Sequence, residues 1–113
     1  MRIQVKGRNG AIVDDELRSK LEKKLEKVAR QVSPLAELEV ELSEERNPGI
    51  RESQVAEATL HLKGVTLRAR EASSDMGHSV NMLAADLARQ VKRHRDKRRG
   101  RRDARAGSQE AAL

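Results

Sequence analysis

The residues best suited to chemistry in this sequence are cations gathered near its C-terminal end. Residues 92–105, KRHRDKRRGRRDAR, hold nine lysines and arginines against Asp96 and Asp103, whereas residues 1–91 carry equal numbers of basic and acidic side chains. The formal net charge of +6 is therefore concentrated in one short segment. Arginine dominates that segment, and its guanidinium group suits bidentate contacts with phosphate. This pattern predicts a polyanionic partner bound at one end of the fold.

The basic segment also allows a second interpretation, a solvated tail with no fixed partner. Another row of cations follows the 3-4-3 spacing of one helix face and consists of Lys20, Lys23, Lys27 and Arg30. Glu22 and Glu26 lie near this row in the sequence, so a solvated helix face explains it as well as a nucleic-acid contact does. For both groups of cations the two interpretations stay open.

The absence of Phe, Tyr and Trp limits how the chain could bind a nucleic acid. Proteins that read single-stranded RNA stack its bases on aromatic side chains, which this chain lacks. We therefore expect it to recognise phosphates, 2′-hydroxyl groups and the shape of a folded RNA.

Catalytic, metal-binding and membrane functions find little support in the residue pattern. The histidines, His61, His78 and His94, form no i,i+4 pair of a helical metal site and belong to no nucleophile–base arrangement. The absence of cysteine removes disulfides, thiol catalysis and thiolate metal sites. No apolar run approaches the roughly 20 residues that a membrane span needs. We expect a cytoplasmic monomer that is not an enzyme, with no catalytic residue, metal, cofactor, small-molecule substrate or membrane contact.

Hydrophobic periodicity predicts the elements that must position the cations. Four strands are expected where apolar residues recur at every second position, near residues 2–6, 37–42, 55–62 and 67–70. Leu and Val at three- and four-residue spacing from Leu17 to Val32 predict a first helix, with Asp14 as its N-cap and Pro34 beyond its end.

A second helix is predicted from Met76 onward, with capping residues at positions 73–75. Its apolar stripe ends at Val91, yet strong helix formers continue to about Lys97. This overhang has no core to pack on. From Gly100 onward the composition indicates disorder.

The predicted order β-α-β-β-β-α gives an α+β fold with a four-stranded mixed sheet. A crossover helix joins two parallel strands, two antiparallel strands follow, and both helices pack on one face of the sheet. The other face carries acidic residues on the second and third strands and basic residues on the outer two, which favours cross-strand ion pairs. Residues 1–97 are expected to form this domain, and residues 98–113 a basic, disordered tail.

Several segments together resemble the ribosome hibernation-promoting factors, also called ribosome-associated translation inhibitors. The resemblance rests on the order of elements and on the segments IQVKGRN, VAEATLHLKG, EASSDM and DLARQVKRHRDK, and it runs over residues 1–97. It implies a fold similar to the double-stranded RNA-binding domain with an added first strand. It also implies binding to 16S ribosomal RNA in the decoding channel of the small ribosomal subunit, where such a protein excludes tRNA and messenger RNA under stress or in stationary phase.

The resemblance also implies which residues contact ribosomal RNA. The basic helix of the family maps onto Arg89, Lys92, Arg93, Arg95 and Lys97, and the expected contacts continue into Arg98 and Arg99. The basic turn after the first strand maps onto Arg8, and the row on the first helix is represented by Lys23 and Lys27.

Two departures from the family pattern accompany this resemblance. Residues 77–81 read Gly-His-Ser-Val-Asn where the family commonly has a Tyr-Ala-Ala-Ile-Asp-like run, which puts the contacts of that turn in question. The chain also resembles the short form of the family, without the second domain that pairs ribosomes, and carries an added arginine-rich tail. Two alternatives are a general binder of double-stranded RNA and a regulator that docks on a protein through Glu37, Glu39 and Glu41.

Overall fold

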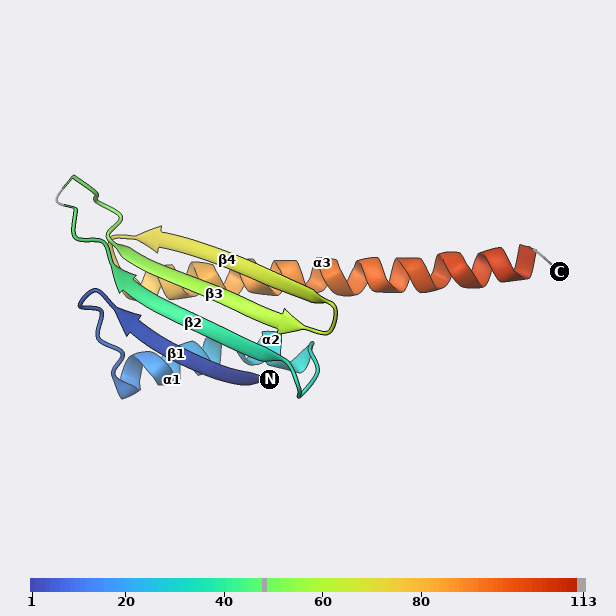
Figure 1. The fold of residues 1–113 in the computed structure, drawn as a ribbon, viewed down its shortest axis with the longest axis horizontal. Coiled ribbons are helices and arrows are strands. Elements are labelled where there is room, and N and C mark those ends of the chain that lie inside the picture. The colour runs from blue at the N-terminus through green and yellow to red at the C-terminus, as the bar shows by residue number, and fades with distance from the viewer. Residues whose placement is uncertain (48, 112–113) are drawn as a thin grey trace.

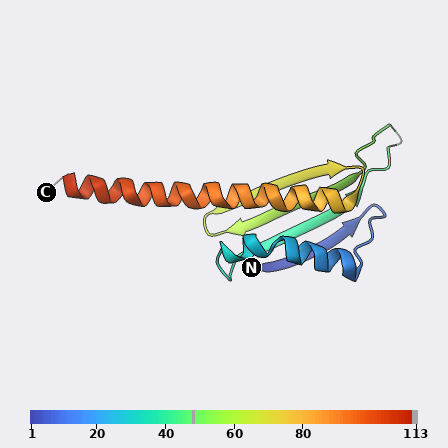
Figure 2. The same cartoon turned by 180° about the vertical axis from the view of Figure 1, so that it is seen from behind.

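The computed structural model describes the backbone of residues 1–47 and 49–111 and, within them, the side chains of residues 1–47, 49–98 and 100. Over this part of the chain there are four strands and three helices in the order β1-α1-α2-β2-β3-β4-α3 (Figure 1). The strands form one sheet, and the helices cover one of its faces, as Figure 2 shows from the helix side. The predicted α+β class is confirmed.

The sheet has the mixed topology that the sequence predicts. β1 (Arg2–Arg8) runs parallel to β2 (Glu37–Glu44), which pairs antiparallel with β3 (Gln54–Leu62). β4 (Val65–Ser73) completes the sheet antiparallel to β3, so the spatial order β1-β2-β3-β4 follows the chain. The helical crossover between β1 and β2 is what allows these two strands to be parallel neighbours.

The first predicted helix, over residues 14–32, is divided in two. α1 (Asp15–Lys24) and α2 (Glu26–Arg30) are separated by a turn at Leu25, although backbone hydrogen bonds of 2.9 and 3.0 Å continue across it. The apolar row therefore keeps its direction toward the sheet despite the break. α3 (Met76–Ala111) lies beside α1 and α2 in the same layer (Figure 2).

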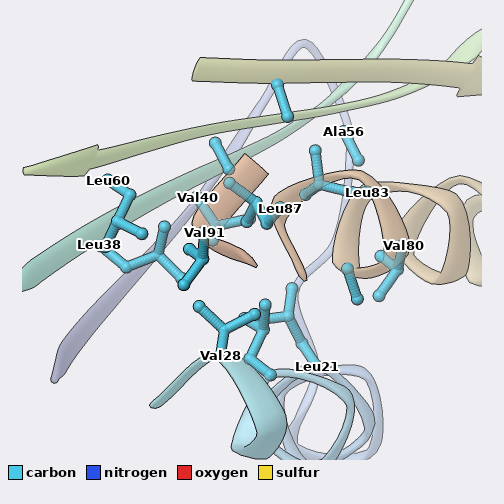
Figure 3. Close-up of a cluster of buried hydrophobic side chains, with 14 of the residues drawn as sticks. Leu21, Val28, Leu38, Val40, Ala56, Leu60, Val80, Leu83, Leu87 and Val91 are labelled. Atoms are coloured by element: carbon cyan, nitrogen blue, oxygen red, sulfur yellow. The ribbon is translucent and has the colours of Figure 1, made fainter. Parts of the chain in front are cut away.

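One apolar core joins the sheet to the helices (Figure 3). At its centre Val40 lies beside Val5 of β1 and opposite Ala58 of β3. The helices contribute the rows that the periodicity predicts, and the fully buried members are Leu21, Leu25, Val28, Val80, Leu83, Leu87 and Val91. Burying each Leu or Val side chain contributes roughly 1.5–3 kcal/mol to folding, so aliphatic residues alone supply the driving force.

The two long helices begin at the caps expected from the sequence. The carboxylate of Asp14 accepts a hydrogen bond of 2.7 Å from the backbone N–H of Leu17. The carboxylate of Asp75 accepts one of 2.9 Å from the backbone N–H of His78. Each cap satisfies a donor that the first helical turn leaves free.

A buried serine pair fixes the start of α3 to the sheet. The hydroxyl oxygens of Ser73 and Ser79 lie 2.6 Å apart, and the Ser79 hydroxyl donates to the backbone carbonyl of Gln54 at 2.6 Å. Ser79 is fully buried, and its hydrogen bonds hold the first turn of α3 against the sheet. This role explains why a polar residue lies in the core at this position. At Gly77 an added Cβ would lie 2.8 Å from the Nζ of Lys20, so the glycine lets the α1 side chain approach.

α3 is longer than the sequence predicts. The helix was expected to end near Lys97, but it continues to Ala111 and has a length of roughly 54 Å at 1.5 Å per residue. Most of residues 98–111 are arginine, alanine, glutamine or glutamate and none is proline, so local propensity favours a helical backbone except at Gly100 and Gly107. Figure 1 shows this part of α3 extending past the end of the sheet. The boundary between a domain over 1–97 and a tail over 98–113 stays a prediction.

We expect Ser79→Ala to lower the free energy of unfolding by about 1–2 kcal/mol, because the buried Ser73 hydroxyl and the Gln54 carbonyl both lose a partner. Urea unfolding followed by far-UV circular dichroism measures this change, since the chain has no aromatic fluorophore. The matched control is Ser74→Ala at an exposed neighbouring position. Equal stability of the two variants would contradict the role assigned to Ser79.

Candidate nucleic-acid interface

Four of the predicted cations form a ridge on the outer side of α3. This α3 ridge consists of Arg89, Lys92, Arg93 and Lys97, all exposed to solvent. Between these four side chains and that of Asp96 the surface has a shallow depression of about 540 Å³. Residues 89, 93 and 97 recur every four positions, so their side chains follow one another along the same side of the helix.

The ridge faces outward because the opposite side of α3 packs in the core. Leu87 and Val91 are buried against the sheet, and each turn of the helix therefore presents the intervening residues to solvent. Beyond Val91 the same rotation continues without a break in the helix. The apolar stripe thus sets the direction of cations that lie past its end.

Most of the positive charge on the α3 ridge is not neutralised by neighbouring carboxylates. Among the described side chains, Lys92, Arg93 and Lys97 form no ion pair within 4.0 Å. Arg89 is 4.0 Å from Asp86, at the limit of an ion pair, and both groups are partly solvated. An exposed array of like charges is stabilised by a closely spaced row of phosphates.

Arg95 and Arg98 lie apart from the ridge, although the sequence placed them in the same group. An Nη of Arg95 donates to the side-chain oxygen of Gln31 at 3.4 Å. Both arginines line a cavity between the end of α2, the turn joining β3 to β4, and α3, which we call the notch. The side chain of Arg99 lies outside the described residues, so its predicted contact stays a prediction.

The cations of the first helix lie in the same layer as the ridge. Lys23 on α1 and Lys27 on α2 are exposed and, among the described side chains, have no ion-pair partner. Arg30 of the same row is 3.8 Å from Glu26, and Arg18 is 3.6 Å from Glu22. The helix layer therefore offers two sets of unpaired cations, one on α3 and one on α1 and α2.

Arg8 is on the other face of the sheet from the helices. It is the last residue of β1 rather than part of the following turn, which is formed by Asn9 and Gly10 with positive φ angles of 55° and 86°. Val5 points into the core, so Arg8, three residues on, points to the open face. There its Nε is 3.0 Å from a carboxylate oxygen of Glu41. The structure does not bring Arg8 together with the α3 ridge.

The open face of the sheet carries the cross-strand ion pairs that the sequence predicts. Arg70 of β4 is 3.1 Å from Glu57 of β3, which is an ion pair. The Nε2 of His61 on β3 is within hydrogen-bond distance, 3.5 Å, of a carboxylate oxygen of Glu39 on β2. With the pair between Arg8 and Glu41, acidic residues of the inner strands are matched by basic residues of their neighbours. Ion pairing therefore offsets part of the charge on this face of the sheet.

No helix in the described part of the chain has a segment long and apolar enough to cross a membrane.

The sequence matches a known protein family over most of its length. A family model described as "Sigma 54 modulation protein / S30EA ribosomal protein" matches residues 3–99. A relative from Picosynechococcus sp., named ribosome hibernation promotion factor, is 28% identical over 103 residues, which cover 90% of this chain and 53% of that protein. One from Azotobacter vinelandii, named ribosome hibernation promoting factor, is 31% identical over 85 residues, 75% of each chain. The chain thus spans about half the length of the first relative.

Two solved structures share the fold. The N-terminal domain of Protein Y from Thermus thermophilus superposes with a TM-score of 0.69 at 27% identity, over 83% of this chain and 99% of that one. A structure described as a ribosomal subunit interface protein from Coxiella burnetii gives a TM-score of 0.67 at 24% identity, over 85% of this chain and 99% of that one. The match to nearly the whole of both structures confirms the four-stranded arrangement.

Proposed function

The chain belongs to the Sigma 54 modulation protein / S30EA ribosomal protein family, and on this premise we propose that it is a ribosome hibernation factor. The names of its two relatives support this role. The observation that carries the proposal is the α3 ridge, whose exposed cations face solvent on the outer side of a helix anchored in the core. Such a surface suits the phosphate backbone of a folded RNA.

The proposed partner is 16S ribosomal RNA of the small ribosomal subunit. The α3 ridge supplies the main phosphate contacts through Arg89, Lys92, Arg93 and Lys97, and Lys23 and Lys27 add contacts from the neighbouring helices. Because α1, α2 and α3 form one layer, a single RNA surface can meet both sets of cations (Figure 2). The open face of the sheet then points away from the RNA.

The proposed mechanism is steric and involves no chemical step. In the decoding channel the domain would occupy the space that tRNA and messenger RNA need, and so hold the ribosome idle in the cytoplasm under stress or in stationary phase. A continuous apolar core makes the domain a poorly compressible body, which is what an occluding protein requires. Charge on the helix side supplies most of the affinity.

We expect binding to small ribosomal subunits to depend steeply on salt. If about six phosphates are neutralised, the logarithm of the association constant falls with the logarithm of salt concentration at a slope of about −4 to −5. Sedimentation with purified subunits at several potassium chloride concentrations measures the slope. A slope near zero would rule out phosphate contacts as the main source of affinity.

Replacing Arg89, Lys92, Arg93 and Lys97 together by Ala is expected to weaken small-subunit binding at least about a hundredfold at 0.1 M salt and to flatten the salt slope. The fold should persist, because all four side chains are exposed and none belongs to the core. Co-sedimentation and thermal unfolding measure the two effects.

The matched control removes four exposed cations from the open face of the sheet, Arg2, Lys6, Arg68 and Arg70, by the same change to Ala. Both variants lose the same net charge, so a difference between them reports location rather than total charge. Equal binding by the two variants would overturn the assignment of the α3 ridge.

Equal affinity of the unmodified protein for plain duplex RNA and for small subunits, in a gel shift, would favour the general RNA binder.

A further inference from the structure

β1 lies at one margin of the sheet, and its outer side has no partner among the described residues (Figure 1). The backbone N–H of Arg2 donates to the carbonyl of Ala36 at 2.8 Å, on the β2 side. Because backbone groups alternate in direction along a strand, those of Ile3 and Val5 point to the outer side, where no hydrogen bond to them is formed. We call this side of β1, with the side chains of residues 2–6, the β1 edge.

The opposite margin of the sheet is covered by α3. The side-chain amide of Gln90 on α3 donates to the backbone carbonyl of Arg68 on β4 at 2.8 Å. An edge strand with free backbone groups can pair with a strand from another chain. The β1 edge is therefore the margin of the sheet that is better suited to strand addition.

On the helix side of the sheet, the core is incompletely covered at the β1 edge. Ile3 and Val5 are only partly buried, whereas their neighbours on β2, Leu38 and Val40, are 0% and 2% exposed. Leu17 of α1, which packs against the same core, is also only partly buried. An added strand with aliphatic side chains on this side would remove apolar surface from water.

On the open face of the sheet, the β1 edge carries cations without a partner. Arg2 and Lys6 are exposed, and among the described side chains neither has a carboxylate oxygen within 4.0 Å. Glu41, which lies beside Lys6 in the register, pairs with Arg8 instead. Two copies of β1 would bring like charges together, which opposes pairing of the strand with itself. The same cations attract a strand that carries acidic side chains.

The inner side of β1 shows which sequence pattern this strand pairs with. β2 begins Glu-Leu-Glu-Val-Glu-Leu, and its glutamates lie beside Arg2, Gln4 and Lys6 in the register. Its aliphatic residues, among them Leu38 and Val40, face the core. A strand on the outer side would meet the same side chains of β1 on both faces of the sheet. The pattern that suits the outer side is therefore the same alternation of acidic and aliphatic residues.

We propose that the β1 edge binds an extended segment of a partner protein in which acidic and aliphatic residues alternate. The backbone of the segment pairs with the outer groups of Ile3 and Val5. Its acidic side chains face Arg2 and Lys6, and its aliphatic side chains cover the partly buried margin of the core. None of these residues belongs to the α3 ridge, so the site does not depend on the proposed function.

Fluorescence anisotropy of dye-labelled peptides tests the proposal on the full chain. The probe has the sequence of residues 37–44, ELEVELSE, and two control peptides carry lysine or glutamine in place of every glutamate. We expect saturable binding of the acidic peptide, about tenfold weaker binding of the glutamine peptide, and no binding of the lysine peptide. Equal binding of all three, or no binding of the acidic peptide at about 1 mM, would overturn the proposal.

A charge reversal in the protein locates the site. Arg2→Glu combined with Lys6→Glu should weaken binding of the acidic peptide about tenfold or more and create binding of the lysine peptide. The matched control is Lys63→Glu combined with Arg68→Glu, which changes the net charge equally at exposed positions near the other margin of the sheet and should keep the preference for the acidic peptide. The same loss of preference in both variants would show a diffuse charge effect and refute the site.

Backbone methylation of the probe separates strand addition from a contact between charges. N-methyl groups on the aliphatic residues remove the donors on one side of the extended peptide, and N-methyl groups on the glutamates remove those on the other side. One of these two peptides should lose binding and the other should keep it. Equal effects of the two would refute strand addition.

Methyl NMR spectra and the oligomeric state complete the test. The acidic peptide should shift the signals of Ile3 and Val5 and leave those of Val91, beside the notch, in place. Shifts confined to residues away from β1 would refute the site. A protein dimer that competes with the peptide, detected by analytical ultracentrifugation, would assign the β1 edge to a second copy and overturn the proposal.

Discussion

The packing of one side of α3 against the sheet is the constraint on which the rest of the structure depends. Val80, Leu83, Leu87 and Val91 place the helix on β3 and β4, and that contact fixes the rotation of the helix about its own axis. Every residue that follows inherits this rotation, because the helix continues without interruption. The outward direction of the α3 ridge is therefore a consequence of aliphatic burial upstream, not of contacts made by the cations themselves.

Charge is separated between the two faces of the fold by different means. On the open face of the sheet, strand pairing places acidic residues next to basic ones, so Glu41 and Glu57 are matched by Arg8 and Arg70. This matching weakens the alternative of an acidic docking edge, since two of the three glutamates it requires, Glu39 and Glu41, already have basic neighbours. On the helix side, side chains four positions apart along α3 carry the same sign, so the charge adds up and a polyanion is favoured.

Features of the fold that depend on the periodicity of apolar residues could be predicted from the sequence. Contacts between residues far apart in the chain could not. Four strands and the sheet order followed from spacing along the chain, because one buried face dictates them. Both caps followed from the aspartates that precede the helices. The side of α3 on which Arg95 lies follows from spacing too, because it comes four residues after the buried Val91. Only its contact with Gln31, 64 residues earlier, could not be predicted. Burial of Ser79 had a signal that was overlooked: it precedes Leu83 and Leu87 at four-residue spacing and so belongs to the buried side of α3. The break at Leu25 and the extension of α3 to Ala111 have no clear signal in the spacing.

The notch and the α3 ridge lie on different sides of the same turns of α3, so contacts on the notch side help to hold the ridge in place. None of residues 92–98 and 100, whose side chains the structure describes, is buried. On the notch side this part of α3 is joined to the fold by the hydrogen bond from Arg95 to Gln31. A helix held on one side keeps the other side in a fixed direction. Arg93 and Lys97 are thus held on the outer side of α3 by groups on its other side, among them Arg95 through its hydrogen bond to Gln31.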